Sequence, residues 1–111
     1  VARSFGNLSI AAGENHFTRY EFARLIEDNV VSFAQPDVSK TGGITELIRI
    51  SNLMSGWNIS INPHTSLTAI NMAASIHILA SIDNSGFFPM SPTNYSRFKT
   101  ARHRRNRQNH R

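Results

Sequence analysis

The chain has 111 residues and no cysteine, which suits one domain or part of one and excludes a disulfide framework, a thiol nucleophile and a thiolate metal site. Its basic excess lies at one end: residues 1–96 carry five basic and seven acidic side chains, a net charge of −2, whereas residues 97–111 carry seven basic side chains and no acidic one. No apolar run reaches the length of a membrane span and no signal-peptide layout is present, so we expect a soluble cytoplasmic protein without membrane partners.

Strand-like and helical patterns alternate along the chain. The sequence predicts strands at residues 8–14, 30–37 and 58–64, helices at 17–28, 43–55 and 66–82, and a candidate fourth strand that begins at 86–88. This alternation is typical of an α/β fold with a parallel sheet or barrel.

The first predicted helix has a clear start. Thr18 and Glu21 have the S/T-x-x-E spacing of a capping box, and Phe17 and Phe22 have the spacing of a hydrophobic staple. We therefore expect the Thr18 side chain to cap this helix.

The second predicted helix has one apolar face. Ile44, Leu47, Ile48 and Met54 recur at helical spacing, and Gly56 is a typical stop at the C-terminal end. We expect this face to pack against the sheet.

Each predicted strand ends in an ionisable side chain just before its loop, namely Glu14, Asp37 and His64. Neighbouring parallel strands lie about 4.8 Å apart, so groups at equivalent strand ends converge on one region. In parallel α/β folds, ligands bind at this carboxyl-terminal edge of the sheet. His16 lies near the same edge and is a weaker candidate for contact with a ligand.

Other interpretations of these residues stay open. An aspartate after a strand is commonly a helix N-cap or a turn former, a lone histidine is often structural, and Glu14 can be solvated or cap the following helix. The coincidence of three such residues at one edge favours a functional site. The stretch SKTGG does not match a phosphate-binding loop, and no Gly-x-Ser-x-Gly accompanies Asp37 and His64, which argues against a serine triad.

Three motifs carry a resemblance to a known family: AGENHFTRYEF, QPDVSKTGGITE and INPHTS, in this order and spacing. Over about residues 8–84 the chain resembles the C-terminal part of the mandelate racemase and muconate lactonising branch of the enolase superfamily, and within it the acid-sugar dehydratases. The resemblance implies a (β/α)8 barrel, of which residues 1–88 would supply the C-terminal half, about strands 5–8. We expect residues 89–111 to form a basic, irregular and disordered tail.

The resemblance implies a role for each residue at the strand ends. Glu14 matches a carboxylate ligand of Mg²⁺, and His64 matches the group that transfers a proton. Asp37 matches the residue that accepts a hydrogen bond from His64 Nδ1 and fixes the tautomer of the ring. Lys40 matches a basic position beside the active site, and Lys40 and His16 are weaker candidates for contact with the substrate.

The implied activity is that of a Mg²⁺-dependent hydro-lyase, which removes a proton next to the carboxylate of an aldonate or aldarate and eliminates water. A racemase, epimerase or cycloisomerase of the same superfamily is the alternative, because these reactions share the enediolate intermediate. The family's two other metal carboxylates, its lysine base and its capping domain belong to an N-terminal part that this sequence lacks. We therefore expect the chain alone to be incomplete and inactive, and the intact protein to be a homo-oligomer.

The basic run at residues 97–111 supports an alternative from another class of protein. Such runs often bind nucleic acid through phosphate contacts, and only Tyr95 and Phe98 are near enough to stack on bases. We therefore expect any binding of nucleic acid by the tail to be nonspecific and sensitive to salt.

Overall fold

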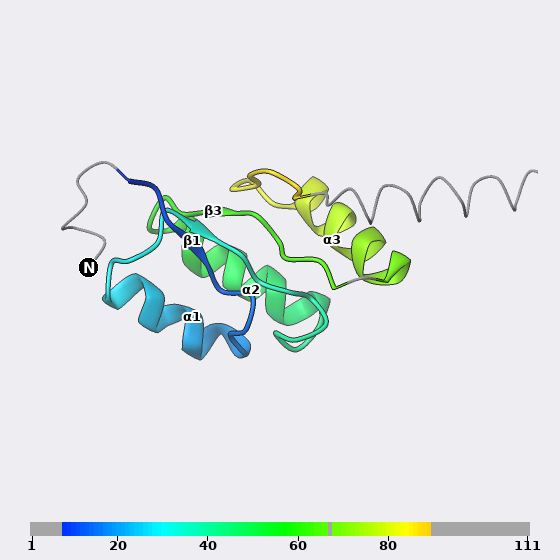
Figure 1. Ribbon diagram of the computed structural model, residues 1–111, viewed down its shortest axis with the longest axis horizontal. Helices are drawn as coiled ribbons and strands as arrows, with labels where there is room; N and C mark the ends of the chain where they lie inside the picture. The colour runs from blue at the N-terminus through cyan, green and yellow to red at the C-terminus, as the bar shows by residue number, and fades with distance from the viewer. Residues whose placement is uncertain (1–7, 67, 90–111) are drawn as a thin grey trace, which may run out of the picture.

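The computed structural model describes residues 8–66 and 68–89 of the chain. Strands and helices alternate in the order β1 (Ala11–Ala12), α1 (Thr18–Glu27), β2 (Phe33–Ala34), α2 (Ile44–Ser55), β3 (Ser60–Ile61) and α3 (Ala69–Ser81) (Figure 1). The alternation agrees with the prediction, and each strand lies inside its predicted stretch but is much shorter. The predicted tail at residues 89–111 lies, apart from Pro89, outside the described residues.

The strands form one parallel sheet in the order β1-β2-β3, as their alternation with helices predicts. Ala12, Ala34 and Ile61 pair in register and therefore share one face of the sheet. Ala34 and Ile61 are fully buried, whereas the residue one position earlier on each strand is exposed or half-buried. The sheet thus has one face that is well covered and one that is not.

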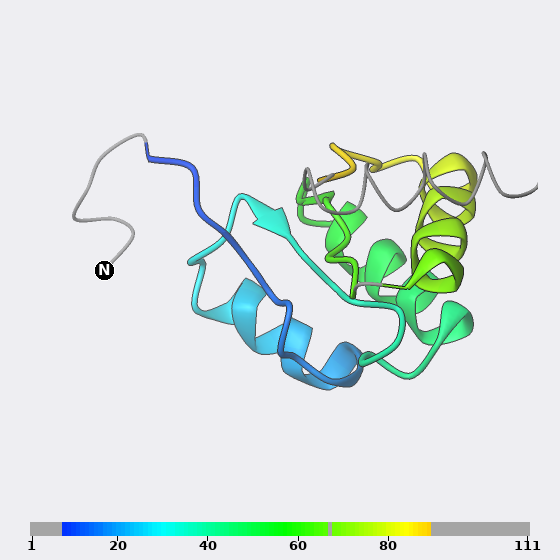
Figure 2. The same ribbon diagram turned by 45° about the vertical axis from the view of Figure 1, so that its right-hand side comes forward.

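The helices form a layer in which α2 lies between α1 and α3 and packs against β3 (Figure 1 and Figure 2). The apolar core comprises Phe22, Leu25, Ile26, Val31, Ala34, Val38, Leu47, Ile50, Met54, Ile59, Ile61 and Ile78. These side chains come from all three helices, from the covered face of the sheet and from the segments next to β2 and β3. The core therefore anchors the strands whose carboxyl ends carry the candidate site.

Helix α1 begins with only the Glu21 half of the predicted capping box, because the Glu21 carboxylate accepts from the N–H of the N-cap residue at 2.5 Å whereas the Thr18 side chain does not cap the helix. Thr18 is its first helical residue, and the N-cap residue is Phe17, which makes no side-chain cap bond. The Thr18 N–H instead donates to the carbonyl oxygen of Thr41, and the Arg19 N–H donates to the carboxylate of Glu46 at 2.9 Å. Contacts with distant residues thus satisfy the Thr18 and Arg19 donors, which the local pattern could not reveal, while Glu21 satisfies the Phe17 donor locally.

Helix α2 buries a face that differs in part from the prediction. Leu47, Ile50 and Met54 are fully buried, whereas Ile44 is 56% exposed. Ile50 lies three residues after Leu47 and four before Met54, so the buried stripe follows the helical period and leaves out the first residue of the helix. Gly56 is the C-cap residue, as predicted.

After α3 the chain returns to the sheet beside β3. Ser85 forms an isolated parallel bridge with Ile61, one residue before the predicted start of a fourth strand at 86–88. The side chain of Asn84 secures this return, because its amide donates to the Ser51 carbonyl oxygen at 3.1 Å and its oxygen accepts from the Ser51 hydroxyl at 2.6 Å. Within the described residues, the sheet therefore continues past β3 by a single residue pair.

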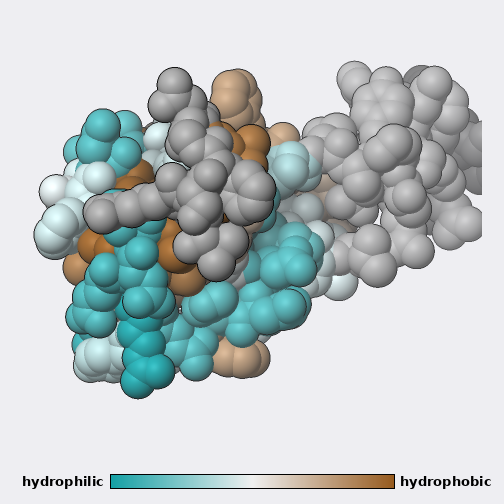
Figure 3. Space-filling view, turned by 60° about the vertical axis from the view of Figure 1, so that its left-hand side comes forward, coloured by the Kyte–Doolittle hydropathy of each residue, from teal (hydrophilic) through white to brown (hydrophobic). Residues whose placement is uncertain are grey.

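Several large apolar side chains stay on the surface: Leu8, Phe17, Tyr20, Ile44, Trp57, Ile70, Ile76 and Phe87. On the face shown in Figure 3, hydrophobic residues reach the surface between hydrophilic ones. Among the described residues, no helix has both the length and the apolar character needed to cross a membrane.

Gly13 joins β1 to Glu14 with φ of +129°, a conformation that favours glycine. A Cβ atom there would lie 2.7 Å from Cε1 of Phe22. We expect Gly13→Ala to lower the free energy of unfolding by about 2–6 kcal/mol through backbone strain and overpacking together, as measured by urea unfolding of the full chain. The control is Gly43→Ala, where φ is +93° and nothing lies within 4 Å, so that only the strain remains. Equal losses in the two variants would contradict the steric argument.

Candidate functional site

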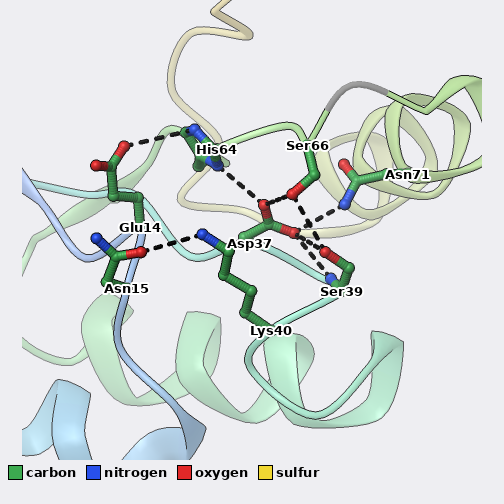
Figure 4. A network of polar contacts seen from close by, with 8 residues as sticks. All are labelled: Glu14, Asn15, Asp37, Ser39, Lys40, His64, Ser66 and Asn71. Atoms are coloured by element: carbon green, nitrogen blue, oxygen red, sulfur yellow. Dashed lines mark hydrogen bonds and ion pairs between the residues drawn. The ribbon is translucent and has the colours of Figure 1, made fainter.

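Three ionisable side chains lie together at the carboxyl ends of the strands (Figure 4). Glu14 follows β1, Asp37 follows β2, and His64 follows β3. Asp37 and His64 form a parallel bridge that continues the register of β2 and β3. In this bridge, as in the two residue pairs that join β2 to β3, the second residue lies 27 positions after the first. The strand pairing that the core stabilises therefore brings Asp37 and His64 side by side.

The His64 ring lies between two carboxylates. Its Nδ1 is 2.9 Å from Asp37 Oδ2, and its Nε2 is 3.4 Å from Glu14 Oε2. The Asp37 side chain is fully buried, whereas that of Glu14 is 55% exposed. One ring nitrogen is thus held inside the protein, and the other faces the more exposed carboxylate.

Asp37 is the centre of a hydrogen-bond network. Its Oδ1 accepts bonds from the Ser39 N–H and hydroxyl at 2.9 and 2.6 Å and from the Asn71 amide at 2.8 Å, and its Oδ2 accepts from Ser66 and His64. Burial would raise the pKa of Asp37, but the bonds from Ser39, Ser66 and His64 outweigh it and hold that pKa well below its usual range. Asp37 is therefore ionised at neutral pH and can only accept, so His64 Nδ1 is the donor.

The low pKa of Asp37 makes the stability of the fold depend on pH. Because this pKa is lower in the folded chain than in the unfolded chain, ionised Asp37 stabilises the fold above the unfolded pKa, and the contribution is lost as pH falls through the folded pKa. We expect this part of the free energy of unfolding to be complete above about pH 5 and to decrease as the pH drops through about 4. Urea titrations of the full chain over this range measure it. The decrease should be smaller in Asp37→Asn, and an unchanged pH dependence in that variant would contradict the assignment.

Lys40 and His16 lie differently with respect to this network. Lys40 Nζ donates to Asn15 Oδ1 at 3.1 Å, next to Glu14 in the chain (Figure 4), and no acidic residue of the described part pairs with it. The His16 ring packs on Phe22 with centroids 5.7 Å apart, and within the described ranges its buried Nδ1 has no hydrogen-bond partner. The structure thus brings Lys40 to the edge of the site and places His16 against the core.

Sequence reasoning missed three members of the network: Ser39, Ser66 and Asn71. Ser39 does carry a local signal, because an aspartate side chain often accepts a bond from the N–H two residues later, and the turn-forming interpretation of Asp37 is therefore also right. Ser66 and Asn71 lie 29 and 34 residues from Asp37 in the chain. Contacts across such separations leave no local pattern to read.

Glu14 is the candidate metal ligand of this chain. Its carboxylate is mostly exposed and offers the oxygen donors that Mg²⁺ prefers. No group of three or more His, Cys, Asp or Glu that could hold a metal ion occurs in residues 8–66 and 68–89. Since Mg²⁺ takes about six oxygen ligands, Glu14 fits as one ligand of a site that needs carboxylates from elsewhere.

Repeated β-α units with ionisable residues at the carboxyl ends of neighbouring strands are the arrangement of α/β enzymes of the barrel type. The sequence profile of the enolase C-terminal domain-like family matches residues 1–109. The chain belongs to this family, and the membership predicted from its motifs is confirmed.

Related proteins include acid-sugar dehydratases. D-galactonate dehydratase from Ralstonia pickettii is 42% identical over 72 residues, which cover 65% of this chain and 19% of that protein. A member of the enolase superfamily from Polaromonas sp. is 47% identical in sequence, with a TM-score of 0.77. The match covers 84% of this chain and 25% of the Polaromonas chain. An enolase from Agrobacterium radiobacter, with galactarate dehydration as its proposed activity, was solved with bound Na and L-malate. It is 29% identical with a TM-score of 0.73, and the match covers 77% of this chain and 22% of the Agrobacterium chain. The chain thus spans about a fifth to a quarter of the length of these proteins.

Proposed function

We propose that this chain supplies the C-terminal half, about strands 5–8, of a (β/α)8 barrel that dehydrates an acid sugar, either an aldonate or an aldarate. The observation that carries the proposal is the contact of His64 with both Asp37 and Glu14 at the carboxyl ends of adjacent parallel strands. Active sites of barrel enzymes lie at this edge. The dehydratase activity of the Ralstonia relative supports the same class of reaction. Residues 1–88 would belong to the barrel and 89–111 to a separate tail.

Glu14 would hold Mg²⁺ together with carboxylates from the N-terminal part of the barrel. When bound, the cation supplies positive charge that stabilises the extra negative charge of an enediolate. Two features of Glu14 suit this role: its carboxylate is mostly exposed, and His64 is its only ion-pair partner among the described residues.

His64 would transfer a proton through Nε2. The Nδ1–H donates to Asp37 at 2.9 Å, which leaves Nε2 as the nitrogen that can take up or release a proton. The buried Asp37 carboxylate compensates the positive charge of the ring whenever Nε2 carries a proton. Asp37 thus orients the His64 ring and remains its hydrogen-bond partner when the ring is positively charged.

Dehydration requires two proton transfers. A base first removes the proton next to the substrate carboxylate, and the electron pair of the C–H bond forms the enediolate. The C–O bond of the neighbouring hydroxyl then breaks, and His64 Nε2–H gives its proton to the departing oxygen, which leaves as water and yields an enol. A racemase or cycloisomerase would share only the first transfer, and the activity of the related D-galactonate enzyme favours elimination.

Lys40 would contact the substrate. Its ammonium donates to Asn15, has no acidic partner in the described part of the chain, and complements the negative charge of an acid sugar. His16 is the weaker candidate, because its ring packs against Phe22. Both assignments follow from position at the carboxyl edge of the sheet.

The test is a barrel completed around this chain. The "completed barrel" joins the N-terminal part of the Ralstonia pickettii D-galactonate dehydratase, up to the residue that aligns with the beginning of this chain, to all 111 residues. We expect it to release water from an aldonate or aldarate when Mg²⁺ is present, with the keto product as the readout, and neither part alone to be active. A folded completed barrel that converts no member of a panel of acid sugars would sink the proposal. Epimerised substrate without loss of water would identify the racemase alternative.

Two proposals concern partners. The intact protein would be a homo-oligomer, which sedimentation of the completed barrel measures. The predicted binding of nucleic acid involves residues 97–111, which lie outside the described residues, and it stays a prediction. A salt titration of binding with and without these residues tests it, because affinity retained after their removal would exclude the tail as the binding segment.

A further inference from the structure

Helix α3 reaches the site through a residue that the proposed mechanism does not use. Asn71, in the first turn of α3, is 5% exposed, and its Nδ2 donates to Asp37 Oδ1 at 2.8 Å. Its backbone N–H binds the hydroxyl of the N-cap residue Thr68 at 3.2 Å. A buried amide is costly unless it is hydrogen-bonded, and within the described residues the Asn71 side chain has its only hydrogen bond with Asp37.

The donors around Asp37 fall into two groups. Both bonds from Ser39 lie within the turn that carries Asp37, so they move with this residue and cannot orient it relative to β3 and α3. Asn71 binds Oδ1 from α3, and Ser66 binds Oδ2 from the loop that precedes this helix. These two bonds come from residues outside the turn that carries Asp37, and each binds a different oxygen of the carboxylate. Of the two donors, only Asn71 is part of a helix.

We propose that Asn71 is a positioning residue, which anchors Asp37 Oδ1 to α3 and thereby keeps Oδ2 directed at His64 Nδ1. The orientation of the Asn71 amide follows from chemistry, because only its NH₂ group can face a carboxylate. A carboxylate fixed in this way holds His64 in the Nδ1–H tautomer and leaves Nε2 available for proton transfer. The consequence for turnover rests on the proposed function, whereas the consequence for the tautomer does not.

The experiment compares two neighbouring buried residues of α3 in the completed barrel. Asn71→Leu removes the donor at a similar volume, and Met72→Leu is the matched control, because Met72 is 3% exposed and apolar. Nitrogen-15 NMR of the histidine side chains reports the tautomer of His64, whose signals are assigned by their loss in His64→Asn. Steady-state kinetics report kcat and KM separately.

We expect Asn71→Leu to raise the population of the Nε2–H tautomer of His64 and to lower kcat by about 10–100-fold with little change in KM. Met72→Leu should keep the tautomer and kcat of the parent protein. An Asn71→Leu protein with the parent tautomer overturns the proposal, even if its melting temperature falls, because that result describes a purely structural role.

Two precautions keep the test decisive. If Asn71→Leu does not fold, Asn71→Ala removes the same donor with a residue that suits a helix, and an unchanged tautomer there overturns the proposal equally. If the completed barrel folds without dehydratase activity, the proposed function fails, while the comparison of tautomers still decides the role of Asn71.

Discussion

His64→Asn in the completed barrel is expected to lower kcat for acid-sugar dehydration by about 10²–10⁴-fold, the usual contribution of a general acid or base. The reason is the position of its ring, whose Nδ1 is bound to Asp37 while Nε2 faces Glu14 at 3.4 Å. An asparagine amide can keep a hydrogen bond to Asp37 but cannot carry a proton to the departing oxygen. Steady-state rates at saturating substrate measure the effect, and KM should change much less.

The matched control for this variant is His77→Asn. His77 lies on the exposed side of α3, away from the Asp37 network, so the same chemical change should leave kcat as it is. Circular dichroism of both variants excludes unfolding as the cause of a loss. A His64→Asn protein that turns over like the parent would remove His64 from the proposed reaction.

Glu14→Gln is expected to lower kcat/KM by about 10³-fold, because the loss of one metal carboxylate removes several kcal/mol of charge stabilisation from the transition state. Glutamine keeps the shape of the side chain and one oxygen donor but not its negative charge. The Mg²⁺ concentration that gives half-maximal rate should rise, and titration calorimetry should show weaker binding of Mg²⁺. Both measurements use the completed barrel.

Glu27→Gln serves as the control for charge. Glu27 is exposed at the end of α1 and makes no ion pair within the described residues, so its loss should change neither the rate nor the affinity for Mg²⁺. If Glu14→Gln bound Mg²⁺ as tightly as the parent, Glu14 would not be a ligand. The alternative interpretation from the sequence, in which Glu14 is a solvated residue at the end of a strand, would then be favoured.

The order of strands and helices could be predicted from the sequence because it follows from local periodicity. The closeness of Asp37 to His64 could also be predicted, since both end a parallel strand of one sheet. The lengths of the strands could not, because a residue counts as strand only where a neighbour pairs with it. Within the described residues β1 has a single neighbour, β2, and the pairing extends over only two residues.

The misses in the site and in α1 have a common physical cause. The Thr18 and Arg19 N–H groups at the start of α1 donate to Thr41 and Glu46, and the buried Asp37 carboxylate accepts from Ser66 and Asn71. All these bonds join segments that are distant in sequence. Local motifs report which donors need partners, but the fold decides which partners they receive.

The contiguity of the site in the chain has a consequence for how such proteins diversify. Glu14, Asp37, His64 and the first turn of the helix that binds Asp37 all lie between residues 14 and 71, on adjoining β-α units. A recombination event that moved this segment as one piece would therefore keep these residues in their mutual register, because the strand pairs that set it lie within the segment. In the proposed barrel, lineages that exchange the remaining half would keep the contacts among Glu14, Asp37 and His64, whereas the other metal carboxylates and the base would come with the exchanged half.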